Sequence, residues 1–131
     1  MTDDEFLHAF FALTLPHAAF RHRDHLRLAW LVARRHGREA AAPIVGAAIR
    51  RYAEAHGHGS AYHETMTRFW VALVVHAAEL HSDVDDFDRF LDAHPMLLDR
   101  SLPLRHWSRE ALFGDAARAA WRAPDVLPLP F

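Results

Sequence analysis

The sequence predicts an all-α fold: a single compact helical bundle of about four long helices, followed by short C-terminal helices and an extended, proline-rich tail. Apolar residues recur at helical spacing along most of the 131 residues, and no convincing alternating strand pattern is present. Capping residues, glycines and prolines fall where such helices would begin and end. Because about half of the residues are apolar (51%), we expect one domain with one core over residues 1–131.

The expected long helices follow in order. The first begins at a capping box of Thr2 and Glu5 and closes at Pro16. The second covers roughly residues 22–36 and is apolar almost all round, which indicates a central, buried helix. The third covers roughly 38–56, with Pro43 near its first turn. The fourth covers roughly 61–81, after Ser60 as its N-cap, and is the second buried helix.

Shorter elements are expected in the C-terminal third. N-cap residues introduce short helices at Ser82, Ser108 and Asp115, and PMLLDRSL forms a further turn. The tail, PDVLPLPF, contains three prolines and must be extended. Its apolar residues predict that it lies against the body of the domain.

Composition excludes several function classes. All 15 basic residues are arginine, and cysteine is absent, so neither a lysine nor a thiol nucleophile is present. The net charge of −2 and the scattered arginines argue against nucleic acid as a partner. No apolar run is long enough to span a membrane, and the acidic start MTDDEF does not resemble a signal peptide, so we expect a cytoplasmic protein.

Twelve histidines are the unusual feature of the composition, and two stand in HRDHLRLAW, residues 22–30. His22 and His25 are three residues apart and share a helix face that continues into apolar residues. Asp24 is either a functional carboxylate or an acid that stabilises the helix start through the helix dipole. Histidines that precede Gly37, Gly57 and Pro95 are better explained as helix-end residues.

A second motif, YHETMTRFW, covers residues 62–70 at the start of the other buried helix. His63 shares a face with Thr67 and Trp70. Glu64 has a competing explanation, because Arg68 lies four residues on and could form a surface ion pair with it.

These two helices are expected to run parallel in an up-down bundle. If their starts are level, His22, His25 and His63 would meet above Trp30 and Trp70. Three histidines can hold a divalent ion, Fe, Cu or Zn, with Glu64 or Asp24 as a further ligand or catalytic group. The sequence therefore predicts a metal-dependent enzyme acting on a small, partly apolar molecule. The predicted pocket residues are Trp30, Trp70, Arg27, Tyr62 and Thr67.

Two alternatives remain open. The first is metal-free acid–base chemistry, with His25 or His63 as base and Asp24 or Glu64 fixing its tautomer. The second is a non-enzymatic ligand-binding or partner protein whose histidines are structural groups at helix ends. The sequence gives no substrate, metal identity or oligomeric state.

The two motifs also carry a resemblance. HxDHLRLAW and YHETxT, together with HPMLLDRSL, WSREALF and PDVLPLP, resemble a group of small bacterial helical proteins of unknown function. The resemblance covers most of the chain and implies a stand-alone helical domain. It implies no activity, so no catalytic residue follows from it.

Overall fold

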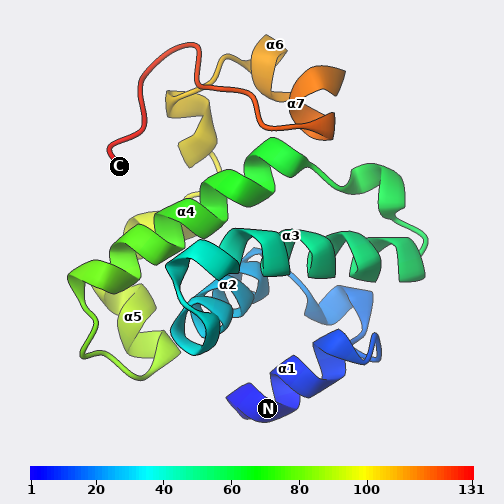
Figure 1. The fold of residues 1–131 in the computed structure, drawn as a ribbon, viewed down its shortest axis with the longest axis vertical. Helices are drawn as coiled ribbons and strands as arrows, with labels where there is room; N and C mark the ends of the chain where they lie inside the picture. The colour runs from blue at the N-terminus through cyan, green and yellow to red at the C-terminus, as the bar shows by residue number, and fades with distance from the viewer.

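The computed structural model describes residues 1–131 and is entirely helical, with no strand (Figure 1). The α-helices are α1 (Asp3–Phe11), α2 (His22–His36), α3 (Arg38–Ala55), α4 (Glu64–Leu80), α5 (Phe87–Ala93), α6 (Arg109–Leu112) and α7 (Asp115–Ala119). Four 3₁₀ turns join them: η1 (His17–Ala19), η2 (Gly59–Ala61), η3 (Pro95–Leu98) and η4 (Leu102–Arg105). The all-α prediction is confirmed. The count of four long helices is not clearly matched, because α1 has only 9 residues.

The centre of the fold is a three-helix unit of α2, α3 and α4, in which each helix packs against the other two. These helices have 15, 18 and 17 residues, long enough to bury a continuous apolar face. Their buried side chains belong to one core cluster that also includes Phe6, Phe90 and Trp107 from other elements. The prediction that α2 and α4 are the buried helices agrees with this core.

The turn between α2 and α3 depends on Gly37. Its φ of 89° and ψ of 165° are open to glycine and costly for residues with a Cβ atom. The chain therefore reverses within one residue, and α3 starts at Arg38 directly beside the end of α2. Pro43 lies inside α3 rather than at its first position, so the helix continues although one backbone donor is missing.

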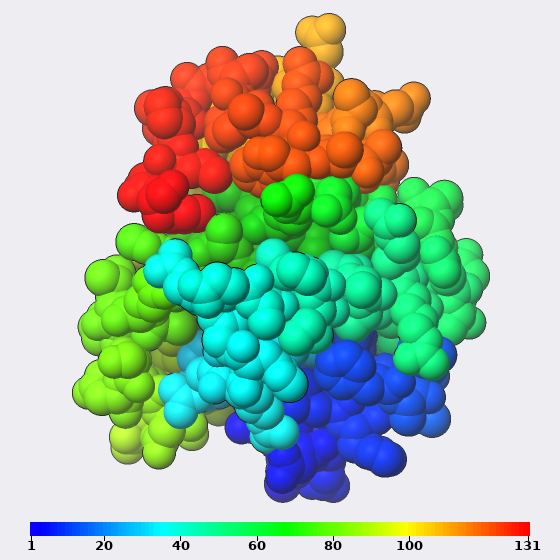
Figure 2. Space-filling view, in the orientation of Figure 1, coloured from blue at the N-terminus to red at the C-terminus, as the bar shows by residue number.

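The C-terminal third forms a cap along α4. Figure 2 shows residues from about 100 onward gathered on one side of that helix. Thr65, which is completely buried at 0% exposure, donates to the Ala120 carbonyl oxygen at 2.9 Å and accepts from the Arg122 amide at 3.1 Å. The Trp107 indole donates to the Arg122 carbonyl oxygen at 2.9 Å. The tail itself lies against the body as predicted, but through polar contacts: Asp125 accepts from the Ser108 amide at 2.8 Å, and the Val126 amide donates to the His106 carbonyl oxygen at 2.9 Å. Val126, Leu127 and Phe131 remain exposed.

None of the helices combines the length and the apolar character that crossing a bilayer requires.

Candidate functional site

The first turn of α2 carries the most unusual histidine of the protein, His25. Its ring stacks on Phe20, with centroids 4.0 Å apart and planes inclined by 25°. Neither His25 ring nitrogen has a hydrogen-bond partner, yet no fully buried side-chain nitrogen or oxygen in the protein lacks one. The His25 nitrogens must therefore reach solvent, although the ring itself is half-buried against Phe20.

Burial, followed by the nearby charges of His22, Arg100 and His17, lowers the pKa of His25 to about 4. The imidazole is consequently neutral at pH 7 and offers a lone pair. Arg100 is exposed, and its charge acts on both His22 and His25. We call Phe20, His22, His25 and Arg100 the α2 site.

His22 is held in place by two contacts. Its Nε2–H donates to the Leu97 carbonyl oxygen at 2.8 Å, and its ring meets Trp70 edge to face at a centroid distance of 4.6 Å. Burial lowers the pKa of His22, an effect that the hydrogen bond to Leu97 partly offsets. His22 is therefore mainly an anchor between α2, η3 and α4.

His63 does not join this site, because both of its ring nitrogens are used elsewhere. It is the N-cap of α4: Nδ1 accepts from the Met66 amide at 3.1 Å. Nε2–H donates to the Leu112 carbonyl oxygen at 2.6 Å. Burial lowers the pKa of His63. No lone pair of this imidazole remains for a ligand.

The expected gathering of His22, His25 and His63 is thus not formed. No group of three or more His, Asp or Glu side chains is placed to hold a metal ion. The physical reason is a stagger between the helices. His22 lies against Trp70, seven residues beyond His63, which corresponds to a rise of about 10 Å along α4.

The two candidate carboxylates also have partners other than histidine. Asp24 Oδ2 accepts from the Arg21 amide at 2.9 Å and closes the first turn of α2. Glu64 Oε1 accepts from the Tyr62 hydroxyl at 2.6 Å, while Arg68 lies 4.0 Å from Glu64 Oε2. Neither carboxylate is hydrogen-bonded to an imidazole, so neither fixes a histidine tautomer here.

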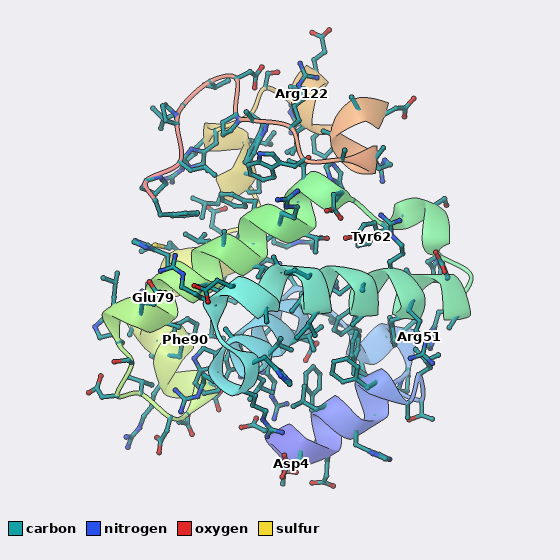
Figure 3. All side chains as sticks on the ribbon, viewed as in Figure 1. Asp4, Arg51, Tyr62, Glu79, Phe90 and Arg122 are labelled. Carbon is teal, nitrogen blue, oxygen red and sulfur yellow. The ribbon has the colours of Figure 1, made fainter.

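Tyr62, Glu64 and Thr67 form a separate polar cluster between α3 and α4. Figure 3 shows Tyr62 at the end of α4, facing α3. Burial, followed by the hydrogen bond to Glu64, raises the pKa of Tyr62 to about 12, and Thr67 opposes that rise. The Arg50 guanidinium lies over the Tyr62 ring at 4.6 Å. Three of the predicted residues therefore meet, but away from His22 and His25.

The remaining pocket residues lie apart. Trp30 packs on Phe87 and Phe90 of α5, at centroid distances of 5.6 and 5.8 Å, so it shares no floor with Trp70. It borders a recess of about 620 Å³ between the ends of α2 and α4 that contains no histidine. Arg27 pairs with Asp3 at 2.7 Å and joins α2 to α1. Trp30 and Trp70 therefore do not line one pocket beside His25. Arg27 does not face His25 either, because it is paired with Asp3.

Two features have no signal in the sequence: the surroundings of His25 and a second pair of histidines. Phe20 and Arg100 are ordinary residues in sequence, and only the fold brings them beside His25. The histidine pair His81 and His94 was missed as well, because each residue alone reads as a helix end. Its hydrogen bond spans 13 residues and has no signature in sequence spacing.

Comparison of the chain with protein-family models, curated proteins and solved structures finds no match. The resemblance carried by HxDHLRLAW and YHETxT therefore stays a prediction.

Proposed function

We propose that the α2 site binds a small organic anion and that His25 accepts a proton there. The observation that carries this proposal is the placement of the His25 ring, which stacks on Phe20 while both of its nitrogens lack a partner within the protein. Arg100 is an exposed cation whose charge acts on His25. A neutral imidazole with free nitrogens beside an arginine is matched by an anion that can also receive or give a proton.

Phe20 holds the His25 ring in place and is not itself open to a ligand, because it is buried, at 7% exposure. Its ring packs against Phe10 and Tyr52, at centroid distances of 4.8 and 4.9 Å, so the ligand would contact the outer face of the His25 ring. The ligand class that fits is a carboxylate with a small, partly apolar body. A carboxylate would pair with Arg100 at the exposed rim, where charge-assisted hydrogen bonds are available.

Binding of an anion would change the acid–base state of His25. A negative charge beside the ring favours the imidazolium and raises its pKa from about 4 toward neutrality. Near such a raised pKa His25 is present in both protonation states with the ligand bound, so it could accept a proton as a general base and return it as a general acid. This is the metal-free alternative, without a carboxylate partner for the histidine. The mononuclear metal prediction has no three-ligand group to support it.

Titration of the protein with benzoate, followed by NMR of the histidine ring protons over pH 3.5–8, tests the binding step. We expect the pKa of His25 to rise by about one unit or more, since a carboxylate contact shifts pKa values on that scale. Arg100→Gln should reduce the rise, whereas Arg51→Gln should not. Arg51 is an exposed arginine of α3 and is not among the charges that act on His25. An unchanged His25 pKa at saturating benzoate would show that no anion binds there.

The chemical step is tested with p-nitrophenyl hemisuccinate, an activated ester that carries a carboxylate. His25 would remove a proton from the attacking water, the ester carbonyl would accept the hydroxide, and p-nitrophenolate would leave. We expect His25→Gln to lower the rate about tenfold or more, within the range of general-base catalysis. His58→Gln, an exposed histidine control, should leave the rate unchanged, as should a chelator. Benzoate binding with equal hydrolysis by the wild type and His25→Gln would instead favour the non-enzymatic binding protein.

A further inference from the structure

A pair of histidines outside the α2 site meets where two helices end. His81 follows the last residue of α4, and His94 follows the last residue of α5. His81 Nδ1 lies 2.8 Å from His94 Nε2, and the ring planes are inclined by 61° at a centroid distance of 4.8 Å. Since one proton joins the two nitrogens, one ring donates and the other accepts. The pair joins the end of α4 to the far end of α5, so it closes the segment of residues 81–94 on itself.

The two rings differ in exposure: one is buried and the other is open to solvent, an arrangement that suits the binding of a metal ion. His94 is buried, at 6% exposure, so desolvation favours its neutral imidazole, the form that binds metal ions. His81 is exposed and leaves a path from solvent to the shared position.

The separation of the nitrogens selects among metal ions. With metal–nitrogen bonds of about 2.0–2.1 Å, two ligands at a right angle have nitrogens about 2.9 Å apart. Two ligands at a tetrahedral angle have nitrogens about 3.4 Å apart. The observed 2.8 Å belongs to a hydrogen bond, so each ring must turn for its lone pair to leave the line between the nitrogens, but their separation already suits the right angle of tetragonal Cu(II) and Ni(II) better than the wider angle of Zn(II).

The surroundings carry charges of both signs, since the Arg34 guanidinium donates to the Val84 carbonyl oxygen at 2.7 Å in the turn after α4, and two features attract a further cation. The C-terminal end of α4, a helix of 17 residues, carries the partial negative charge of the helix dipole next to His81. The turn that follows contains three exposed aspartates, Asp83, Asp85 and Asp86, which raise the local concentration of cations.

We propose that His81 and His94 form a two-histidine site for a tetragonal divalent ion, Cu(II) or Ni(II). When the ion binds, the ring that donates in the hydrogen bond changes tautomer and carries its proton on its other nitrogen, so that both facing nitrogens offer lone pairs. No third His, Asp or Glu is grouped with them, so water completes the coordination. The ion would fasten the end of α4 to the end of α5.

Titration of the untagged full-length protein with Cu(II), Ni(II) and Zn(II) by calorimetry, with EPR of the Cu(II) complex, tests the proposal. We expect one equivalent of Cu(II) with two nitrogen ligands, and tighter binding of Ni(II) than of Zn(II). His81→Gln, which removes an exposed ring, should weaken the affinity for Cu(II) about tenfold or more. His58→Gln is the matched control: His58 stacks face to face on His17, at 4.2 Å and 24°, so their nitrogens do not converge.

Two results would overturn the site. Equal Cu(II) affinity in the wild type and His81→Gln, or an equal loss in His58→Gln, would assign the binding to dispersed histidines. Tighter binding of Zn(II) than of Ni(II) would contradict the right-angle geometry. His94→Gln should lose affinity for Cu(II) in the same way, provided that circular dichroism shows this variant to be folded. If His94→Gln does not fold, the comparison of the wild type with His81→Gln still decides the proposal.

Discussion

The Nε2–H of His22 donates to the carbonyl oxygen of Leu97 at 2.8 Å, and this bond joins the first turn of α2 to η3, 75 residues further along the chain. Leu97 is completely buried at 0% exposure, so few other donors can reach its carbonyl group. The same imidazole rests on Trp70 of α4. One side chain therefore holds together three segments that are distant in sequence.

Replacing His22 by alanine should destabilise the protein by about 1–2 kcal/mol, because a partly buried carbonyl loses its donor and an aromatic contact is lost. Urea unfolding monitored by circular dichroism measures this change. His8→Ala is the control, since His8 is exposed and its ring makes no hydrogen bond; it should stay within about 0.5 kcal/mol of the wild type. Equal losses in both variants would contradict the anchoring role of His22.

The stability of the protein should fall as the pH drops below neutrality. The pKa of His25 is lowered to about 4 in the folded state, whereas in the unfolded chain it is near 6.5. Between about pH 4 and pH 6.5 the His25 side chain is protonated in the unfolded chain but neutral in the folded protein. The free energy of unfolding therefore decreases as the pH falls through this range and increases as the pH rises. The full effect of His25 is about 3 kcal/mol at most. His22, His63 and His94 act in the same direction, since their pKa values are also lowered.

Urea unfolding at pH 7.5, 6.0, 5.0 and 4.5 tests this dependence. His25→Phe preserves an aromatic ring against Phe20 and removes the titrating group, so its stability should fall less steeply with acid. A wild-type slope in His25→Phe would mean that His25 titrates normally in the folded state.

His63 stabilises the start of α4 in two separable ways, because it caps the helix through Nδ1 and donates to Leu112 through Nε2. His63→Ala should cost about 2–3 kcal/mol, the sum of a lost cap and an unsatisfied carbonyl. His63→Asn should recover about 1 kcal/mol, because asparagine is a good N-cap but too short to reach Leu112. Thermal and urea unfolding of the two variants give the comparison. No difference between them would show that the cap contributes nothing.

The helices of the central unit could be predicted from sequence because their signals are local. The predicted range 22–36 is the observed range of α2, which ends at Gly37 with a positive φ. The start of α4 was placed three residues too early, at 61, because Ser60 looked like a better N-cap than His63. A histidine that caps through Nδ1 has no distinct signature, and here a tertiary contact to Leu112 favours it.

The candidate site was only half predictable for a different reason. That His25 is special followed from its place on a core-facing stripe, but its environment depends on Phe20 and Arg100. Whether His63 lies near His25 depends on how far α2 and α4 are shifted along their axes relative to each other. The apolar pattern of each helix does not specify this shift, because it stays the same whatever the shift is. The C-terminal third then supplies carbonyl groups, at Leu97 and Leu112, that bind the two histidines separately.

The substitution Gly46→Ala in α3 should change the stability of the protein differently when the Tyr62 hydroxyl is present and when it is removed. A Cβ atom at Gly46 would lie 3.2 Å from Tyr62 Oη, which donates to Glu64. Gly46→Ala should therefore be neutral or destabilising in the wild type, where the hydroxyl must shift. In the Tyr62→Phe background it should stabilise by up to about 1 kcal/mol through helix propensity. A double-mutant cycle by urea unfolding measures the coupling, and additive effects would argue against the contact.

The tail should depend on Thr65, the buried residue that both donates to Ala120 and accepts from Arg122. Thr65→Val keeps the shape of the side chain but leaves two backbone groups without partners, so a loss of about 2–3 kcal/mol is expected. Thr65→Ser, which retains the hydroxyl, should lose about 1 kcal/mol for the missing methyl group. Limited proteolysis adds a local readout: cleavage in residues 120–131 should become faster in Thr65→Val than in Thr65→Ser. If both variants release the tail at the wild-type rate, Trp107 and the other cap contacts hold it without Thr65.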